Sequence, residues 1–400
     1  MKPLILGQQL VSKKHNKKLF ERKVTEGKIR VTKVSQLSKY DKLKTPVLVS
    51  NEKLEHVIDG TKLEFDLTDG AEHKDLLFEL AIRNKEVTNA QPISHSSKTL
   101  DHIKRLVVIG DSLSDSEGRM KSKTLGVMLS SRQYYKGRFT NGFVWADFIS
   151  SGAYLKKYMN SEEARDNFKL LNYAEGGAVT AKYSKLNPTF WFISNMKRQI
   201  HKHEKKEGFQ EGDMVVLALS ANDYMTFDKT DVEKVVNCYE KEIIKMVVSK
   251  GVKNILVTGI PDLSITAHAH KESDSDRAKM SGLSYQHNQF LKSKLEELQE
   301  QFSGNGVKIG FFDFSGQLYE LVDMANQVGY DTITEEQAGY IDLPRVFGLK
   351  GNSQPFDSAH RHVFHDEVHP SQEVHQMLAS RMCDFIVSQF GRTSKMTPSE

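Results

Sequence analysis

Short apolar runs alternate with helical patterns over the last three quarters of the chain. Each run has the length of a strand rather than of a helix, and apolar residues recur every three or four positions between several runs. Strands buried on both faces and joined by helices form a parallel sheet with helices on both sides. The sequence therefore predicts an α/β fold. The expected strands lie at 106–109, near 171–173, and at 214–219, 254–257 and 307–312.

Three helices have the clearest periodic patterns. The first opens with Thr230 and Glu233, a capping-box pattern in which the two side chains satisfy free N–H groups, and Gly251 suits its left-handed C-cap. The second spans about 284–302, and the third closes the chain with an apolar stripe over 374–386. The first two lie between expected strands, as the α/β prediction requires.

The first hundred residues differ from the rest in charge and pattern. Residues 1–44 contain 13 Lys/Arg and 3 Asp/Glu, a net charge of +10, so the remainder of the +4 chain carries −6. We expect a mobile basic arm that either stays solvated or binds an anionic membrane surface. No nucleic-acid motif accompanies it, so no nucleic-acid partner is expected. Residues 45–100 are expected to form a small α/β or α+β subdomain with a polar linker, and 101–392 the main domain.

Composition also bears on where the protein acts. The start of the chain lacks the apolar stretch and small-residue cleavage site of a secretory signal, so we expect a cytoplasmic protein or one that leaves without a cleaved signal. Two cysteines provide no disulfide framework. No apolar run approaches the roughly 18 residues that a membrane-spanning helix needs.

A serine follows the first expected strand directly. In Gly110-Asp111-Ser112 the glycine permits a tight turn, and the carboxyl ends of parallel strands are where active sites form. A serine hydroxyl needs a neighbouring base to become a nucleophile. Taken alone, these residues could equally form a turn that caps a helix. No Gly-Lys-Ser/Thr follows, which excludes a phosphate-binding P-loop.

The base and its partner are predicted near the C-terminus. Asp366 and His369 are three positions apart, so they can meet across one turn, where the carboxylate fixes the tautomer of the imidazole and stabilises its protonated form. Pro370 favours an extended backbone at His369 and places it in a loop before the closing helix. Ser112, Asp366 and His369 are therefore the predicted catalytic residues.

Further histidines raise the alternative of a metal site. His360, His362 and His365 lie close to His369 in the sequence, but their spacing matches no zinc pattern. We therefore expect no metal and no organic cofactor. The three additional histidines are predicted to lie at the surface or in the substrate cleft.

Two more strand ends offer groups that can bind a developing negative charge. Gly176 and Gly177 follow the second strand, where a backbone N–H can point into the site, and we favour Gly176. Asn222 follows the third strand, and its amide can donate. Together with the Ser112 N–H they would form an oxyanion hole, in which one donor contributes about 3–4 kcal/mol. Each of these four motifs alone is typical of an ordinary turn. Their occurrence together, in this order and at strand ends or in the C-terminal loop, predicts a serine hydrolase.

The order Gly-Asp-Ser, Gly-Gly, Asn-Asp and Asp-x-x-His resembles the four sequence blocks of the SGNH/GDSL hydrolases. Residues 137–142 and 259–264 are similar to the lipase branch that includes thermolabile haemolysins and bacterial glycerophospholipid:cholesterol acyltransferases. The resemblance is strong from 104 to about 390, weaker over 46–103 and poor before that. Ser220 stands where the family often has glycine, and we expect little harm from so small a side chain.

The resemblance implies a flavodoxin-like, three-layer fold and a lipid substrate. An acyl chain would leave a glycerophospholipid through an acyl-Ser112 intermediate and pass to water or to a sterol. The resemblance also implies a secreted effector at the cytosolic face of host membranes, activated by a host Rho-family GTPase. Two alternatives remain: an esterase for small acyl groups, and a GTPase- or membrane-binding module whose hydrolase fold is vestigial.

Overall fold

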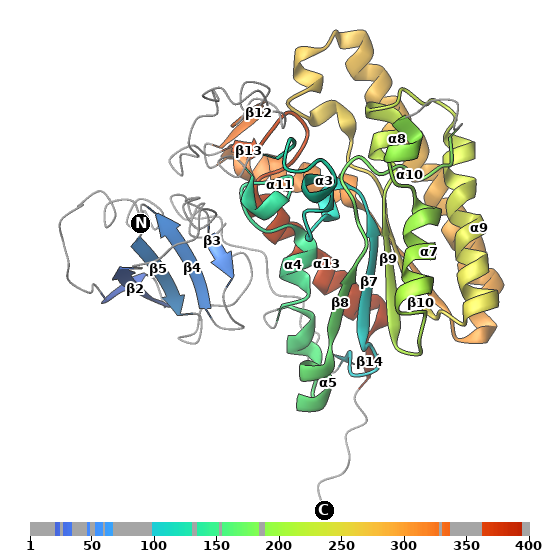
Figure 1. Ribbon diagram of the computed structural model, residues 1–400, viewed down its shortest axis with the longest axis horizontal. Helices are drawn as coiled ribbons and strands as arrows, with labels where there is room; N and C mark the ends of the chain where they lie inside the picture. Colours follow the sequence, from blue (N-terminus) through green and yellow to red (C-terminus); the bar gives the residue numbers. More distant parts are fainter. Residues whose placement is uncertain are drawn as a thin grey trace, which may run out of the picture.

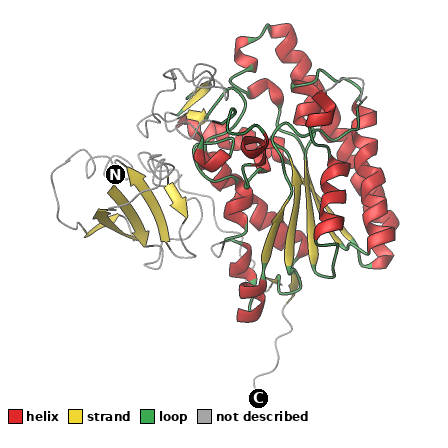
Figure 2. Cartoon of the chain, in the orientation of Figure 1, coloured by secondary structure: helices red, strands yellow, loops and turns green. Residues whose placement is uncertain are grey.

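The computed structural model describes residues 98–129, 134–151, 154–183, 189–327, 330–336 and 362–393, and the backbone of five strands between residues 21 and 66. Figure 1 shows the path of the chain, and Figure 2 shows the central sheet with helices on either side. Among the described residues, no helix is both long enough and apolar enough to cross a membrane.

A five-stranded parallel sheet forms the centre of the larger domain (Figure 1). Its order is β11-β10-β9-β7-β8, which is the 2-1-3-4-5 order of flavodoxin-like folds when the strands are counted along the chain. All of β7, β9 and β10 is buried, as strands covered on both faces must be. The predicted fold and all five predicted strands are confirmed. The strands are β7 (Arg105–Gly110), β8 (Lys169–Asn172), β9 (Asp213–Ala218), β10 (Asn254–Thr258) and β11 (Lys308–Phe312).

Alternate residues of each strand enter two separate apolar cores. Val107 and Ile109 pack with helices α7 and α9 on one face of the sheet, whereas Leu106 and Val108 pack with α4 and α13 on the other. The longer helices are α7 (Met196–Lys206), α9 (Val232–Lys250), α10 (Asp274–Phe302), α11 (Phe314–Gln327) and α13 (Gln372–Phe390). The shorter helices are α3 (Arg119–Lys123), α4 (Trp145–Ile149), α5 (Glu162–Asn167), α6 (Thr189–Phe192) and α8 (Ala221–Met225).

In the described part of the larger domain, four short strands lie outside the central sheet. The antiparallel pair of β6 (Lys98–Thr99) and β14 (Arg392–Thr393) brings the two ends of the larger domain side by side. The parallel pair of β12 (Asp331–Glu335) and β13 (His362–Phe364) precedes the loop with the predicted base.

The structure corrects the predicted starts of two helices. The N-cap of α9 is Asp231, whose carboxylate accepts the Lys234 N–H at 3.0 Å, so the Thr230 capping box is wrong by one residue. Aspartate is as good an N-cap as threonine, which explains the error. Gly251 caps the other end with φ 69°, as predicted. Helix α10 begins ten residues before the predicted 284, because its polar first half lacks the apolar stripe and the Ser273 side chain caps it.

The N-terminal strands form an antiparallel sheet of order β1-β2-β5-β4-β3. Two of them lie within 1–44, where we predicted an arm, and β2 pairs along β5 with Ile29 opposite Phe65. The missed signal is an alternation of apolar with basic or polar residues in β2, which the high charge obscures. The division of the chain at residues 44 and 100 stays a prediction. The strands are β1 (Glu21–Val24), β2 (Gly27–Lys33), β3 (Pro46–Leu48), β4 (Lys53–Ile58) and β5 (Thr61–Asp66).

Candidate active site

The three predicted catalytic residues lie in one hydrogen-bonded chain at the carboxyl end of the sheet. His369 Nε2 is 2.8 Å from Ser112 Oγ, although the two residues are 257 positions apart in the sequence. His369 Nδ1 is 2.8 Å from each carboxylate oxygen of Asp366. All three residues are buried. This order of nucleophile, imidazole and carboxylate is the geometry that activates a serine hydroxyl.

The turn that carries Ser112 is fixed by contacts from both sides. Strand β7 ends at Gly110, and Ser112 begins a short 3₁₀ helix whose N-cap Asp111 accepts the Leu113 N–H at 3.1 Å. Gln199 of α7 binds Gly110 twice, accepting its N–H at 2.9 Å and donating to its carbonyl at 2.8 Å. This clamp holds the backbone two residues before the serine. Sequence analysis did not identify Gln199, because nothing in a polar helical residue marks the strand that it contacts.

The loop that carries His369 lies between β13 and α13, as predicted. The Asp366 carboxylate accepts the backbone N–H of His369 at 2.8 Å, so the turn and the side-chain pair form together. The predicted lipase-type segment 137–142 anchors this loop. Thr140 donates its hydroxyl to the Pro370 carbonyl at 2.9 Å, and Asn141 Oδ1 accepts the Gln372 N–H at 2.8 Å.

Asp366 has a further partner that sequence analysis missed. The buried hydroxyl of Tyr134 donates to Asp366 Oδ2 at 2.8 Å. Burial alone would raise the pKa of Asp366, but the neighbouring His369, above all, holds it well below its usual range. Asp366 is therefore a carboxylate that accepts from both the imidazole and the phenol. No local motif connects Tyr134 to a residue 232 positions away.

The two additional histidines that the structure describes have their side chains beside carboxylates other than Asp366. His365 is fully buried, with Nδ1 3.2 Å from Glu336 Oε2 and its ring edge-on to Tyr134, so its predicted place at the surface or in the cleft is wrong. His362 is partly exposed, with Nε2 3.8 Å from Asp331. His360 lies outside the described residues. Within the described ranges, no three His, Cys, Asp or Glu side chains are grouped so that they could hold a metal ion.

Gly176, Gly177 and Asn222 line the same pocket as Ser112 and His369. The Gly176 N–H donates to Asp115 Oδ2 at 3.3 Å, and a Cβ at this position would lie 2.2 Å from the Phe139 ring. A side chain at position 176 would therefore clash with this ring, and the Gly176 N–H already has a partner, whereas Gly177 has a φ of +73°. The occupied N–H of Gly176 counts against our preference for it, and the identity of the donor stays a prediction.

Asn222 has one fixed partner for each end of its amide. Its nitrogen donates to the Ala178 carbonyl at 3.1 Å, and its oxygen accepts from the Thr226 hydroxyl at 2.9 Å. These contacts fix which way the amide faces. The nitrogen carries two N–H groups, so a second donor remains for the pocket.

Buried carboxylates hold the loops around the pocket. Burial raises the pKa of Asp115 and of Asp223 to about 6, although each accepts several hydrogen bonds. Asp115 accepts from the N–H groups of Arg119 and Met120, and Asp223 from that of Thr180 at 2.7 Å. The two side chains therefore connect the strand-end loops that carry the predicted oxyanion donors to neighbouring backbone.

Ser220 occupies a backbone conformation that explains the glycine often found there in the family. Its φ is 102°, a region that side chains with a Cβ rarely adopt. Its hydroxyl lies 2.7 Å from the Thr180 hydroxyl and 3.1 Å from that of Tyr239. These buried hydrogen bonds offset part of the strain, so serine is tolerated directly before the helix that carries Asn222.

The pocket beside Ser112 is mainly apolar. Such a lining accepts a hydrocarbon chain, while the hydrogen-bonded groups at one side act on an ester carbonyl. The arrangement suits transfer of an acyl group to and from a serine. Its apolar members include Met120, Met128, Phe139, Phe192, Met225 and Phe227.

Comparisons with known proteins agree with this chemistry. The family described as GDSL-like Lipase/Acylhydrolase matches residues 106–382. The chain is 39% identical to the secreted effector protein SseJ of Salmonella typhimurium over 310 residues, covering 76% of this chain and 69% of that one. It is 27% identical to the phosphatidylcholine-sterol acyltransferase of Aeromonas hydrophila, covering 72% and 91%, and 23% identical to the thermolabile hemolysin of Vibrio parahaemolyticus, covering 71% and 64%. The chain therefore belongs to the GDSL lipase/acylhydrolase family, as an acyl hydrolase or acyltransferase.

Proposed function

We propose that the chain removes an acyl group from a glycerophospholipid and passes it, through an ester on Ser112, to water or to the hydroxyl of a sterol such as cholesterol. The observation that carries the proposal is the hydrogen-bonded chain of Ser112, His369 and Asp366 beside an apolar pocket. The name of the Aeromonas relative, a phosphatidylcholine-sterol acyltransferase, supports both the donor and the acceptor. We place this activity in the proposed domain of residues 101–392.

In the proposed reaction, His369 Nε2 takes the proton of Ser112 while its Nδ1–H donates to Asp366. Ser112 Oγ then attacks the ester carbonyl, and the N–H groups of Ser112 and Gly177 and the Asn222 amide donate to the oxyanion. His369 next gives its proton to the oxygen of the departing lysolipid. It finally removes a proton from water or sterol, which attacks the acyl-serine and frees Ser112.

Replacing Asn222 with alanine is expected to lower kcat by about 10²–10³ with little change in KM. The lost donor contacts the oxyanion more strongly than the ground-state carbonyl, so the loss falls on the transition state. Steady-state kinetics on a soluble ester measures both constants. Asn305→Ala serves as the control, since it makes the same chemical change at an exposed residue that does not line the pocket. An effect of Asn222→Ala confined to KM would contradict the assignment.

Replacing Tyr134 with phenylalanine tests the partner of Asp366. We expect turnover to fall by about tenfold, because a hydrogen bond to a charged group is worth roughly 1.5–3 kcal/mol. The carboxylate would then interact more strongly with the imidazolium, so the acid limb of the kcat/KM profile should move to higher pH. Lower activity with an unmoved profile would show that Tyr134 serves packing alone.

The substrate class is tested by lipid mass spectrometry on phospholipid vesicles with and without cholesterol. We expect lysophospholipid with free fatty acid in the first case, and additional cholesteryl ester in the second. A short soluble ester is assayed in parallel. Cleavage of the short ester with intact vesicle lipid would favour an esterase for small acyl groups. A protein inert toward both substrates and toward a serine-directed phosphonate would be a binding module with a vestigial site.

We further propose that the chain is a secreted effector that acts at host membranes, because its relative SseJ is described as a secreted effector. Activation by a host Rho-family GTPase stays a prediction from the family resemblance. Vesicle assays with and without such a GTPase, loaded with GTP or GDP, test it. Equal turnover in all three mixtures would remove the GTPase from the proposal.

A further inference from the structure

Four exposed apolar side chains lie on two segments that border the pocket. Leu125 and Val127 follow α3 and are 94% and 42% exposed, and Trp191 and Phe192 of α6 are 65% and 41% exposed. The next residue of the first segment, Met128, lines the pocket, as does Phe192. We call these four side chains the apolar rim. Both segments therefore contribute a side chain to the pocket and carry exposed apolar side chains beside it.

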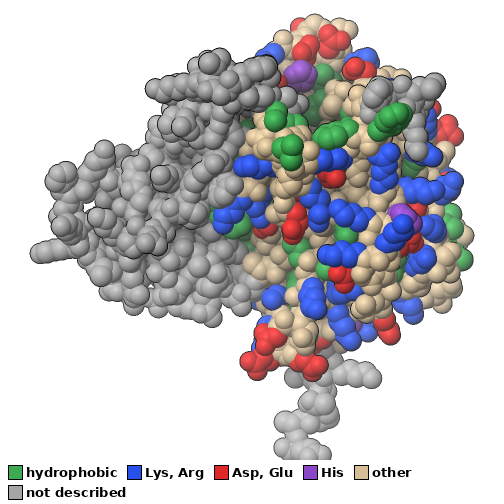
Figure 3. Space-filling model, in the orientation of Figure 1, with side chains coloured by type: hydrophobic (Ala, Val, Ile, Leu, Met, Phe, Trp, Pro, Cys, Tyr) green, Lys and Arg blue, Asp and Glu red, His purple; other side chains and the backbone are tan. Residues whose placement is uncertain are grey.

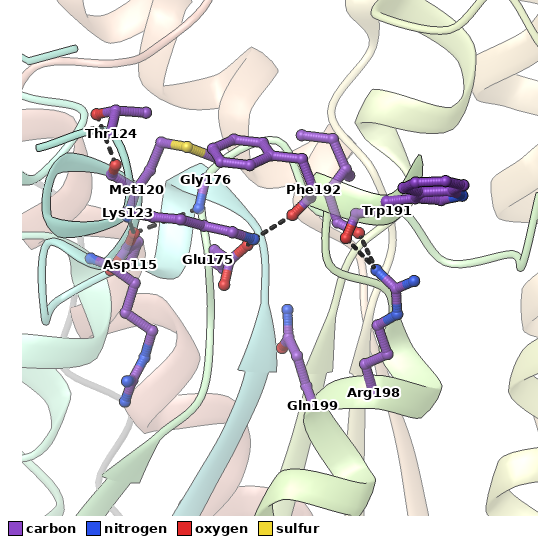
Figure 4. A network of polar contacts seen from close by, with 12 residues as sticks. Asp115, Met120, Lys123, Thr124, Glu175, Gly176, Trp191, Phe192, Arg198 and Gln199 are labelled. Carbon is purple, nitrogen blue, oxygen red and sulfur yellow. Dashed lines mark hydrogen bonds and ion pairs between the residues drawn. The ribbon is translucent and has the colours of Figure 1, made fainter. Parts of the chain in front are cut away.

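Two cationic side chains bind the backbone of the segment that carries Trp191 and Phe192. Lys123 at the end of α3 donates to the Phe192 carbonyl and pairs with Glu175 at 2.6 Å. Arg198 of α7 donates to the Ile193 carbonyl at 2.5 Å. Figure 4 shows both cations reaching the carbonyls of this segment while the Trp191 indole points away from them. These contacts fix the backbone that carries Trp191 and Phe192.

The segments that carry the rim are strongly basic. Residues 117–129 and 189–203 together contain six Lys/Arg and one acidic residue, Glu117. Lys123, Lys197 and Lys202 are exposed. Figure 3 shows Lys and Arg side chains beside hydrophobic ones on this face of the domain. A surface that combines exposed apolar groups with positive charge is complementary to a bilayer with anionic headgroups.

We propose that the apolar rim is the surface by which this protein docks on a lipid bilayer, with Leu125 and Trp191 inserted at the boundary between headgroups and acyl chains. Contiguous exposed apolar groups mark interaction sites, and tryptophan is enriched at that boundary. Docking in this orientation opens the pocket toward the lipid, so an acyl chain enters without crossing water. The inference rests on the proposed function for its choice of substrate.

Tryptophan fluorescence tests the docking orientation directly. The chain has two tryptophans, and Trp145 is 1% exposed, so Trp191 dominates any change at the surface. The experiment uses the full chain with Ser112→Ala, so that lipid is not consumed. Equimolar phosphatidylcholine and phosphatidylserine vesicles should shift the emission to the blue, and brominated lipid should quench it. Adding Trp191→Phe should abolish the shift. Vesicle-bound protein with unshifted emission would overturn the proposal.

Matched substitutions separate the rim from general surface hydrophobicity. Leu125→Ser and Trp191→Ser should each weaken vesicle binding by about tenfold, as expected from losing one inserted apolar side chain. The controls are Val248→Ser on α9 and Tyr285→Ser on α10, which are 68% and 66% exposed and do not line the pocket. These should bind as the parent does. Equal binding by rim and control variants would overturn the proposal. So would a parent protein that is a dimer and that Leu125→Ser converts to a monomer, because the rim would then be a contact between two copies of the chain.

Activity assays distinguish this failure from failure of the proposed function. If the rim docks on lipid, Leu125→Ser lowers turnover of vesicle phospholipid and leaves turnover of a soluble short ester within about twofold. Phospholipid cleavage that persists unchanged in both rim variants would discard the docking surface while the proposed function stands. A parent protein that shows the fluorescence shift but cleaves no phospholipid would discard the function while the docking surface stands.

Discussion

Replacing Ser112 with alanine is expected to abolish ester cleavage, with a loss on the order of 10⁶ in turnover. The hydroxyl is the only nucleophile in the hydrogen-bonded chain with His369, so no neighbouring group can form the acyl intermediate. The fold should persist, because the turn is held by the Gln199 clamp on Gly110 and by Asp111 rather than by the Ser112 side chain. Circular dichroism checks that the fold persists, and reaction with a serine-directed phosphonate checks that the nucleophile is lost.

Ser114→Ala is the matched control, because the same turn places this serine two residues away. Its hydroxyl accepts the Trp145 indole N–H at 3.1 Å, so its loss should lower the free energy of unfolding by about 1 kcal/mol and leave the phosphonate reaction intact. A folded Ser112→Ala protein that keeps a tenth of the parent activity would show that another residue is the nucleophile.

The parts of the fold that could be predicted are those that depend on local sequence patterns. Strands β7, β9 and β10 are continuous apolar runs, and their carboxyl ends carry Gly110, Ser220 and their neighbours, so parallel order alone brings these loops together. Asp366 and His369 lie in one turn, and their contact follows from their spacing. The pairing of Ser112 with this turn was inferred from chemistry, because a serine nucleophile needs a base, and the resemblance to a known family supported it, since no local rule joins residues 257 positions apart.

The parts that could not be predicted depend on contacts between distant segments. No local pattern marks Tyr134 or Gln199 as part of the site, because only the folded chain places them beside Asp366 and Gly110. Gly176 and Gly177 look equivalent in sequence, and they are distinguished by the Asp115 carboxylate and the Phe139 ring beside Gly176 and by the positive φ of Gly177. The same limit made His365 look like a cleft residue, although its ring packs in the interior.

The free energy of unfolding at acidic pH tests the charge of Asp366 independently of catalysis. Its pKa in the folded protein lies below the ordinary value, so its negative charge stabilises the fold at neutral pH. That stabilisation is present above the ordinary pKa of 3.8 and is lost as the pH falls toward about 2. Asp366→Asn should therefore flatten the decline of unfolding free energy in this window. A decline as steep as that of the parent would mean that other carboxylates cause it.

Replacing Asp366 with asparagine is expected to cut turnover by roughly 10⁴ while the structure is preserved. The amide oxygen can take the place of Oδ1 and accept the backbone N–H groups of Val368 and His369, so the turn keeps its contacts, while the NH₂ group takes the place of Oδ2 beside Tyr134. Its NH₂ group, however, donates to His369 Nδ1 and leaves the proton on Nε2, which then cannot take the proton of Ser112. Asp231→Asn controls for the chemical change, because asparagine caps α9 as well as aspartate does.

The rate should fall in parallel on short esters and on phospholipid, since the tautomer acts on Ser112 before any substrate is distinguished. The expected loss also exceeds the 10²–10³ predicted for Asn222→Ala, because Asp366→Asn leaves His369 in a tautomer that cannot act as the base, whereas Asn222→Ala removes a single oxyanion donor. Both variants can be compared by their rates of reaction with a phosphonate that needs an activated serine. Asp366→Asn should react slowly, and Asn222→Ala should react faster than Asp366→Asn. If Asp366→Asn instead kept parent activity, Tyr134 or a water would have to orient the imidazole, and the carboxylate would serve the fold alone.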